Sequence, residues 1–549
     1  MPVVSHPGAG HKISVTILSS FGWLHILGKP HACRVTEMML APLKNVLSRF
    51  WEFFYSRAVA PCRLPEPVDV ADEQLKINAL RIVVGLAALW RTGLVTFSAL
   101  YYFPPHGFLS CPFQFWLALV TLTFTGLFTL GFLTPVATVG LLLFYNYMDL
   151  TLSTATLGTN VFTCCLFFFL FANAGSRLSV DALALKNEKS PLHALTRACY
   201  SVIKFPTREQ LRAYLWLLFV SYGLTSLGAA SHHVSDKSWL TGETMSLLLN
   251  SSFLASQWQF FRVVSAQLPW LFSTISPAIC VVQILFQGLM IPLVYTRWGC
   301  WFVGLYGTGF ALGSLILLQL SYLPWTEGVL WALVFCPARY ITRPFRRAGS
   351  AGEPGPRGWQ PTSFAAVATA CTLVCFLLFT AVVAGSSYPG IKLLRKAAHH
   401  LPHKLYYLGL DSPDVFNRLD LSTGKYWYVM ERQTADGKIE HVPLYPENGS
   451  REIYHWFDTV CFGNLIAWKR MMGLYDGDSR ELLAPGQPCY SMIKSVAEFD
   501  RRLMRLAPDT EYRVTVYGAE DYTGKNPHPV DTLVFRSRRH MAQTGANVH

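Results

Sequence analysis

The chain has 549 residues, of which 52% are hydrophobic, 14% aromatic and only 14% charged. Soluble globular proteins carry ~25% charged residues, so this composition excludes an ordinary soluble enzyme, and ordinary Gly and Pro contents exclude a collagen or a disordered chain. The net charge of +13 occurs in nucleic-acid-binding proteins, but in a chain with many apolar segments it more often marks loops on the cytoplasmic side of a membrane. We therefore expect a membrane protein with membrane lipid, and no nucleic acid, among its partners.

The first 77 residues precede the long apolar segments. Residues 13–28 form a short apolar run that contains His25 and lacks a convincing small-residue cleavage site, so a signal peptide or an additional span stays an open alternative here. Between residues 39 and 58, large apolar side chains alternate with Lys44, Arg49 and Arg57 at helical spacing. This stripe predicts a helix that lies on a membrane surface.

About nine apolar segments are candidates to cross a bilayer of ~30 Å as helices that rise ~1.5 Å per residue. Three of them are short, which leaves the count open by one or two, because a short helix crosses only with local thinning of the bilayer. The nine cover residues 78–103, 113–132, 135–148, 159–174, 211–227, 275–295, 301–320, 323–335 and 364–384.

Lysine and arginine in the short loops predict the orientation of the chain. Residues 186–212, between the fourth and fifth segments, and residues 339–357, between the eighth and ninth, are rich in both, whereas the loops 106–112, 149–158 and 228–269 carry almost none. Basic loops stay on the cytoplasmic side. The N-terminus is therefore expected to be cytoplasmic and, with nine crossings, everything after residue 384 lies outside.

The composition changes at Ser386, where long apolar runs stop, so residues 385–549 are expected to form an α+β domain on the outer face. Thr-Ala-Asp-Gly at 434–437 predicts a hairpin turn in which Gly437 takes a positive φ. Cys461 and Cys489 are the only cysteines in this domain, and whether they pair is left open, since spacing does not bring two Cα atoms within bonding reach. Strands are predicted at 425–433, 438–444, 511–517 and 530–537, and helices at 454–472 and 491–506.

These patterns together predict the fold class. It is a polytopic α-helical membrane protein of about nine transmembrane helices with a C-terminal extracytoplasmic α+β domain. The expected divisions are an N-terminal segment (1–77), a transmembrane domain (78–384) and the outer domain (385–549).

Arg91 is the sharpest candidate for function, because charged side chains inside a membrane are costly and rare. It lies ten residues deeper in the first segment than Arg81, roughly 15 Å along a helix axis. Polar side chains in neighbouring segments either line a cavity with it, for an anionic or quinone-like ligand, or form a hydrogen-bond network that fixes helix packing. These predicted partners are Asn146, Asn160, Gln283 and Gln287, the last two one turn apart on one helix face.

Histidines in the outer loops form a weaker candidate site. Three imidazoles and a carboxylate suit zinc or copper, but adjacent histidines in a loop are more often solvated, and no HExxH or CxxC spacing occurs. We therefore predict no metal. The weak candidates are His106, His232, His233 and Asp236.

Five short segments follow one another along residues 75–340: Asn78-Ala-Leu-Arg81-Ile82, Tyr145-Asn-Tyr-Met-Asp149, Ser179-Val-Asp181, Tyr222-Gly-Leu224 and Trp239-Leu-Thr-Gly242. Together they resemble the horizontally transferred transmembrane (HTTM) family, which includes the vitamin K-dependent gamma-glutamyl carboxylase. The resemblance rests mainly on the Ser-Val-Asp segment and the Trp-x-x-Gly segment, and Leu178 stands where the family pattern has Trp.

The carboxylase pattern is broken at two places. The stretch Leu227-Gly-Ala-Ala-Ser231 has no Lys where the resemblance implies a base, Lys237 is displaced, and Leu157-Gly-Thr-Asn160 stands where the family has a His. Without a base of this kind the proton-abstraction step is lost, so gamma-carboxylation is not expected. Catalytic residues stay unassigned, and so does the question of whether the chain is an enzyme.

The resemblance implies a protein of the bacterial inner (cytoplasmic) membrane. It is expected to bind a lipidic or quinone-like ligand among its helices, with Trp239 among the ligand-binding residues. It would act in the modification or maturation of a secreted or membrane partner. The alternative is a non-catalytic scaffold or accessory subunit whose outer domain binds a partner protein.

Overall fold

A computed structural model of the chain describes residues 49, 52–102, 112–151, 157–200, 206–250, 255–318, 320, 322–347, 426–434, 436–442, 511–518 and 528–536, together with 494, 497, 498, 500, 501, 504–507, 509 and 510. The chain divides into two compact units, Met1–Arg57 and Ala58–His549, and all helices and strands from α2 onward belong to the second. Several predictions lie outside the described residues: the apolar run 13–28, most of the surface helix at 39–58, the span 364–384, the helix 454–472, His106, Cys461 and Cys489.

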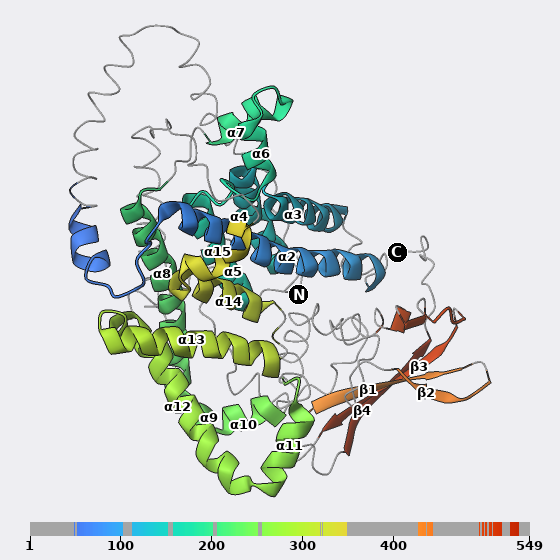
Figure 1. The fold of residues 1–549 in the computed structure, drawn as a ribbon. Helices are drawn as coiled ribbons and strands as arrows, with labels where there is room; N and C mark the ends of the chain where they lie inside the picture. The colour runs from blue at the N-terminus through green and yellow to red at the C-terminus, as the bar shows by residue number, and fades with distance from the viewer. Residues whose placement is uncertain are drawn as a thin grey trace, which may run out of the picture. The chain divides into compact units, whose positions relative to one another are not determined.

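The first eight predicted apolar segments are all helices (Figure 1). Among the described residues, three stretches are long and apolar enough to cross a membrane: Arg208–Ser231, Pro269–Leu293 and Arg297–Leu317. The chain is thus a mostly helical protein with a few helices that could span a membrane. The eight helices are α2 (Val70–Tyr102), α3 (Pro112–Leu130), α4 (Thr134–Thr151), α5 (Leu157–Phe171), α8 (Arg208–Ser235), α12 (Pro269–Leu293), α13 (Arg297–Leu317) and α14 (Leu323–Phe335).

The region between the fifth and sixth segments, expected as a loop, is largely helical. α8 continues to Ser235. Asp236 then caps the short helix α9, because its side chain accepts a hydrogen bond from the Ser238 backbone N–H at 2.9 Å. α10 and α11 then pack on α12. The remaining helices are η1 (Tyr55–Val59), α6 (Val180–Lys186), α7 (Pro191–Tyr200), α9 (Lys237–Leu240), α10 (Glu243–Asn250), α11 (Trp258–Gln267) and α15 (Ala338–Arg347).

Small residues bring the long helices together. α2 packs against α3 and α14, α8 against α12, and α13 against α14. Gly307 of α13 lies so close to Trp331 of α14 that a Cβ on it would be 2.3 Å from the indole. A Cβ on Gly223 of α8 would likewise be 2.6 Å from the side chain of Ile291 in α12. In lipid, burial of apolar surface does not drive helices together, and membrane helices instead pack through close backbone approach at small residues.

A buried carboxylate joins α4, α6 and α7. Asp181 is fully buried and accepts hydrogen bonds from the backbone N–H groups of Leu133 and Thr134 at 2.7 and 2.8 Å, from the Thr134 hydroxyl at 2.7 Å and from the Tyr200 hydroxyl at 2.8 Å. Its negative charge lies at the N-terminus of α4, where the helix dipole favours it. Burial, together with the Asp181 carboxylate, raises the pKa of Tyr200, so the phenol stays a donor. The Ser179-Val-Asp181 segment thus holds α6 against the N-terminus of α4 and against α7.

The C-terminal strands form an antiparallel sheet in the order β2-β1-β3-β4. The predicted hairpin is confirmed, since β1 and β2 pair through a turn in which Gly437 has φ +79°. The described residues between 494 and 501 are helical, as predicted. The strands are β1 (Tyr426–Gln433), β2 (Ile439–His441), β3 (Glu511–Gly518) and β4 (His528–Arg536).

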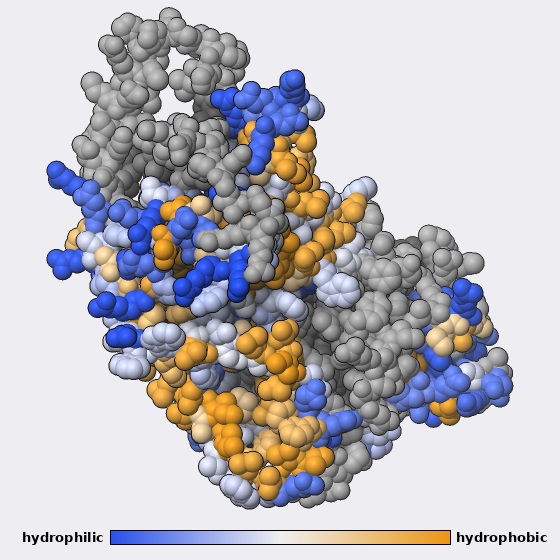
Figure 2. Space-filling view, viewed as in Figure 1, coloured by the Kyte–Doolittle hydropathy of each residue, from blue (hydrophilic) through white to orange (hydrophobic). Residues whose placement is uncertain are grey.

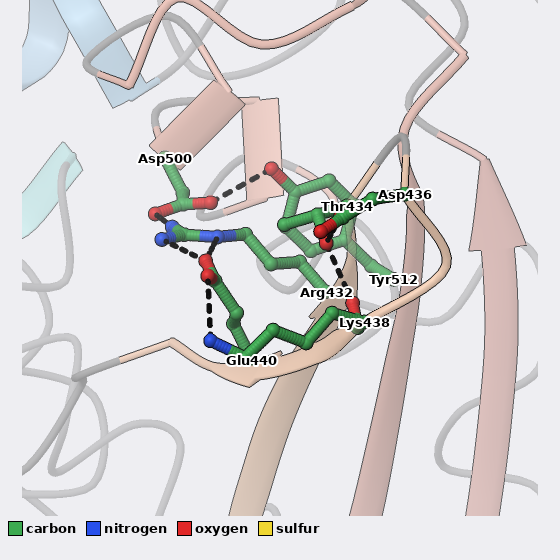
Figure 3. Close-up of polar contacts among 7 residues, drawn as sticks. All are labelled: Arg432, Thr434, Asp436, Lys438, Glu440, Asp500 and Tyr512. Atoms are coloured by element: carbon green, nitrogen blue, oxygen red, sulfur yellow. Dashed lines mark hydrogen bonds and ion pairs between the residues drawn. The ribbon is translucent and has the colours of Figure 1, made fainter.

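An ion-pair cluster ties the sheet to the segment around residue 500. The Arg432 guanidinium contacts Asp500 at 2.7 Å and Glu440 at 3.1 Å, and the Tyr512 hydroxyl donates to Asp500 at 2.8 Å (Figure 3). Burial opposes the charge on Arg432, but the two carboxylates outweigh it and raise its pKa. A buried arginine held by two carboxylates fixes how β1 meets this segment.

Candidate functional site

Residues of the helices from α8 to α14 line a cavity of about 320 Å³, which we call the Glu327 cavity. Its wall is mainly apolar, with α10 contributing four residues and a few polar side chains interspersed. The polar and aromatic side chains in the wall include Tyr222, His233, Trp239, Gln283, Gln287 and Glu327. A largely apolar pocket with a few polar groups is the usual form of a small-molecule site.

Glu327 is the most unusual member of this wall. It is fully buried in α14, a helix whose other residues are apolar except for Thr326. Its Oε1 accepts a hydrogen bond from the Tyr222 hydroxyl at 2.8 Å, whereas Oε2 has no hydrogen-bond partner among the residues the structure describes. A buried polar atom without a partner costs roughly 1–3 kcal/mol, more when it is charged. Such an atom on a cavity wall is suited to meet a donor group on a ligand.

Close helix packing positions the Tyr222–Glu327 pair. Tyr222 is followed by Gly223, which lets α8 approach Ile291 of α12, and the Tyr222 ring lies edge-on to Trp331 of α14 at a centroid distance of 5.6 Å. The close packing at Gly223 and the contact with Trp331 together orient the Tyr222 phenol toward α14. The Tyr222-Gly-Leu224 segment therefore contributes to the cavity directly.

Gln283 and Gln287 both line the cavity, as their one-turn spacing predicts for residues on a single face of α12. Gln283 Oε1 accepts from the Tyr306 hydroxyl at 2.8 Å, and Gln287 Oε1 lies 3.0 Å from Nδ1 of His233. The His233 ring in turn stacks on Trp239, with ring centroids 3.6 Å apart and planes 18° apart. Gln287, His233 and Trp239 thus form a connected row from α12 through α8 to α9, and Gln283 lies one turn from Gln287 on the same helix.

The turn after Trp239 explains the Trp-x-x-Gly pattern. Gly242 has φ +78°, a backbone region that favours glycine. A Cβ on it would lie 2.3 Å from the backbone nitrogen of Pro277 in α12. The glycine therefore lets this turn seat against α12 and holds Trp239 at the cavity.

Arg91 does not belong to this cavity. It is buried in α2, where its Nη1 donates to the Tyr145 hydroxyl at 2.6 Å and its guanidinium lies over the Tyr322 ring, 4.4 Å from the centroid. Asn146 accepts a hydrogen bond from Thr163 at 3.0 Å, and Asn160 is buried on α5. The predicted polar set thus divides in two. Arg91, Asn146 and Asn160 lie among α2, α4 and α5, and only Gln283, Gln287 and Trp239 line the cavity.

The histidines contribute no metal site that the structure can show. His233 contacts Gln287 and Trp239, and Asp236 caps α9, while His232 lies in the last turns of α8. Within the described ranges no group of three His, Cys, Asp or Glu side chains could hold a metal ion. His106 lies outside these ranges.

Glu327, Tyr222 and Tyr306 are the site residues that the sequence reasoning missed or gave no role. The rule that singled out Arg91, an ionisable side chain inside an apolar segment, applies equally to Glu327. Glu327 is the one charged residue in the short apolar segment 323–335, so the sequence itself contains this signal. Tyr306 gives no such signal, because a tyrosine in an apolar helix is ordinary.

Compared with known protein families, curated proteins and solved structures, the chain matches none of them. Function must therefore be argued from the site itself.

Proposed function

We propose that the chain is a polytopic membrane protein of the HTTM family, with about nine crossings, a cytoplasmic N-terminus and an outer C-terminal domain, in a bacterial inner membrane. Support comes from the first eight apolar segments, all of which are helices, three of them long and apolar enough to cross a membrane among the residues the structure describes. The segments that carry the resemblance also have defined structural roles. Asp181 caps α4, Tyr222 holds Glu327 and Gly242 seats the turn after Trp239.

We propose further that the Glu327 cavity binds a lipidic or quinone-like ligand. The unpartnered Oε2 of Glu327 carries this proposal, since a quinol hydroxyl would donate to it and relieve the cost of its burial. The cavity of about 320 Å³ is at the small end of the range for ligand sites. It suits a ring-sized head group rather than a whole isoprenoid tail.

The chemistry proposed for this ligand does not include gamma-carboxylation. Lys237 starts α9, is exposed and is not among the residues that line the cavity, so it does not replace the base of the carboxylase. The polar wall provides acceptors in Glu327 and the glutamines and an imidazole in His233. The bound ligand would serve the modification or maturation of a secreted or membrane partner.

The second candidate is a non-catalytic scaffold or accessory subunit whose outer domain binds a partner protein. The missing Lys and His favour it. In that case the Tyr222–Glu327 and Gln283–Tyr306 hydrogen bonds serve helix packing alone.

Variants at two glycines of α13 distinguish ligand binding in the Glu327 cavity from the scaffold function. Gly313 lines the cavity and nothing lies within 4 Å of where its Cβ would stand, so the side chain of Gly313→Leu has room to enter the cavity. Gly309, one turn away, also has open space but is not among the cavity-lining residues, and Gly309→Leu is the matched control. Both changes favour the helix by roughly 0.8 kcal/mol, so neither should impair folding.

The experiment purifies the full chain in mild detergent and quantifies co-purified small molecules by mass spectrometry. We expect a bound quinone or lipid in the wild type and in Gly309→Leu, and its loss in Gly313→Leu. Glu327→Gln should retain it about tenfold less well, because one charge-assisted hydrogen bond is lost. Arg91→Ala should keep it. Loss in Arg91→Ala but not in Gly313→Leu would remove the cavity from the proposal. A wild type that carries no small molecule but captures a partner protein would favour the scaffold.

A further inference from the structure

A second and larger hollow, of about 950 Å³, runs along α13 and α14, and we call it the α13–α14 groove. Its wall is apolar over most of its length, with Trp301 and Leu312 from α13 and Trp325 from α14. Three arginines also line it, Arg63, Arg297 and Arg339. It shares no lining residue with the Glu327 cavity, so it is a separate site.

The three arginines meet at one end of the groove. Arg297 begins α13, and Arg339 follows the end of the antiparallel helix α14, so both lie at the same end of the helix pair. Arg63 joins them because its backbone N–H donates to Val294 O at 2.8 Å, in the turn before α13, and its carbonyl accepts from the Cys300 thiol. The opposite end, toward Leu312, is apolar.

No carboxylate among the lining residues neutralises this charge. The nearby Glu66 is engaged elsewhere, by Arg212 at 2.8 Å and Arg208 at 3.3 Å. α15 adds further basic residues at the same end, and its sequence is strongly amphipathic. Figure 2 shows apolar residues over much of α11–α13 and hydrophilic residues gathered toward α15. The groove therefore has a cationic end and an apolar body.

The dimensions of the groove suit a lipid. From Arg297 to Leu315 the α13 wall extends roughly 27 Å, at ~1.5 Å per residue. That is close to the ~30 Å hydrocarbon thickness of a bilayer. Acyl chains can follow the apolar wall while the head group stays at the arginine end, where the planar guanidinium matches phosphate oxygens in pairs.

We propose that the α13–α14 groove is a specific site for an anionic glycerophospholipid, whose phosphate is bound by Arg63, Arg297 and Arg339. Basic pockets between membrane helices bind such head groups. Zwitterionic lipid in the groove, or a second copy of the chain over it, are the competing occupants. The site requires α13 and α14 to lie in a bilayer but does not require any ligand in the Glu327 cavity.

The test reconstitutes the full chain in nanodiscs and counts retained lipids by native mass spectrometry. Phosphatidylglycerol and phosphatidylcholine with identical acyl chains are the probes. The variant Arg63→Gln/Arg297→Gln/Arg339→Gln removes the cationic end. A matched control, Lys186→Gln/Lys189→Gln/Arg197→Gln, removes three exposed charges that do not line the groove and do not belong to α15.

We expect the wild type and the matched control to prefer phosphatidylglycerol. The arginine variant should lose that preference by about 10- to 100-fold, since each arginine near an anionic membrane surface raises the affinity several-fold. Gly328→Leu, which fills the groove at a position with open space, should lower retention of both lipids. Gly313→Leu should leave retention unchanged, because it fills only the Glu327 cavity.

Equal retention of both lipids by the wild type would overturn the proposal. So would an equal loss in the matched control, which would mean that net charge alone attracts lipid. A dimer that separates in Gly328→Leu without any change in lipid count would identify a second copy as the occupant and refute the lipid site.

Discussion

Asp181→Ala removes the carboxylate that joins α4, α6 and α7. The side chain accepts four hydrogen bonds, two from backbone N–H groups and two from the hydroxyls of Thr134 and Tyr200. Alanine leaves all four donors without their acceptor and takes the negative charge from the N-terminus of α4. Each change is destabilising on its own, so the variant should be among the most damaging single substitutions in the described part of the chain.

The expected loss can be estimated from these contacts. A hydrogen bond to a charged group contributes about 1.5–3 kcal/mol, but four bonds that share one carboxylate are not additive. A buried donor left without its acceptor costs about 1–3 kcal/mol, and for four such donors that share one acceptor we expect about 4 kcal/mol in total. At about 2–4 °C per kcal/mol for a large domain, the apparent melting temperature should fall by about 8 °C or more.

The assay is thermal unfolding of the purified chain in mild detergent, followed by tryptophan fluorescence at one fixed scan rate. Asp181→Asn, which keeps acceptor oxygen but not the charge, should show about half of the loss. Glu188→Ala, seven residues along, removes an exposed carboxylate and should stay within about 0.5 kcal/mol of wild type. An Asp181→Ala protein that melts together with Glu188→Ala would refute the view that the Asp181 carboxylate holds these helices together.

Two further predictions concern Tyr200 and Gly242. The pKa of Tyr200 is raised above the unfolded value of ~10, so the stability that the neutral phenol gives is present below about pH 10 and lost above it. Wild type should therefore lose more stability than Tyr200→Phe between about pH 9 and pH 11, measured by chemical denaturation. Gly242→Ala places a Cβ against the backbone of α12 at φ +78°, and should cost about 2 kcal/mol or more in thermal unfolding. Gly309→Ala, in open space within α13, should be neutral or slightly stabilising.

Each of these has a clear contrary result. Equal alkaline sensitivity of the wild type and Tyr200→Phe would mean that burial and the neighbouring Asp181 do not raise the pKa of this phenol. Equal stability of the two glycine variants would mean that the turn after Trp239 does not seat tightly on α12. In that case the stacking of His233 on Trp239 would need another cause.

Local patterns predicted the elements well. Runs of apolar residues gave the first eight helices, and alternation with a Thr-Ala-Asp-Gly turn gave the hairpin of β1 and β2. Both signals depend on residues close in sequence, where helix or strand geometry alone fixes which side chains share a face. The same reasoning placed Gln283 and Gln287 together on one face of α12, and both line the cavity. The same reasoning did not predict the helices between α8 and α12. α9, α10 and α11 are short, so their capping residues and amphipathic patterns extend over too few residues to indicate a helix.

The composition of the chain, 52% hydrophobic with its apolar residues in long runs, by itself determined a mostly helical protein with helices that could cross a membrane. Only the tertiary structure decided which polar residues meet. It separated Arg91 from Gln283 and Gln287, and it brought Tyr222 of α8 to Glu327 of α14, more than a hundred positions apart. The physical reason is that helix packing depends on small residues such as Gly223 and Gly307, whose partners lie far along the chain. A pattern read along one helix cannot supply the neighbouring helix that receives its polar face.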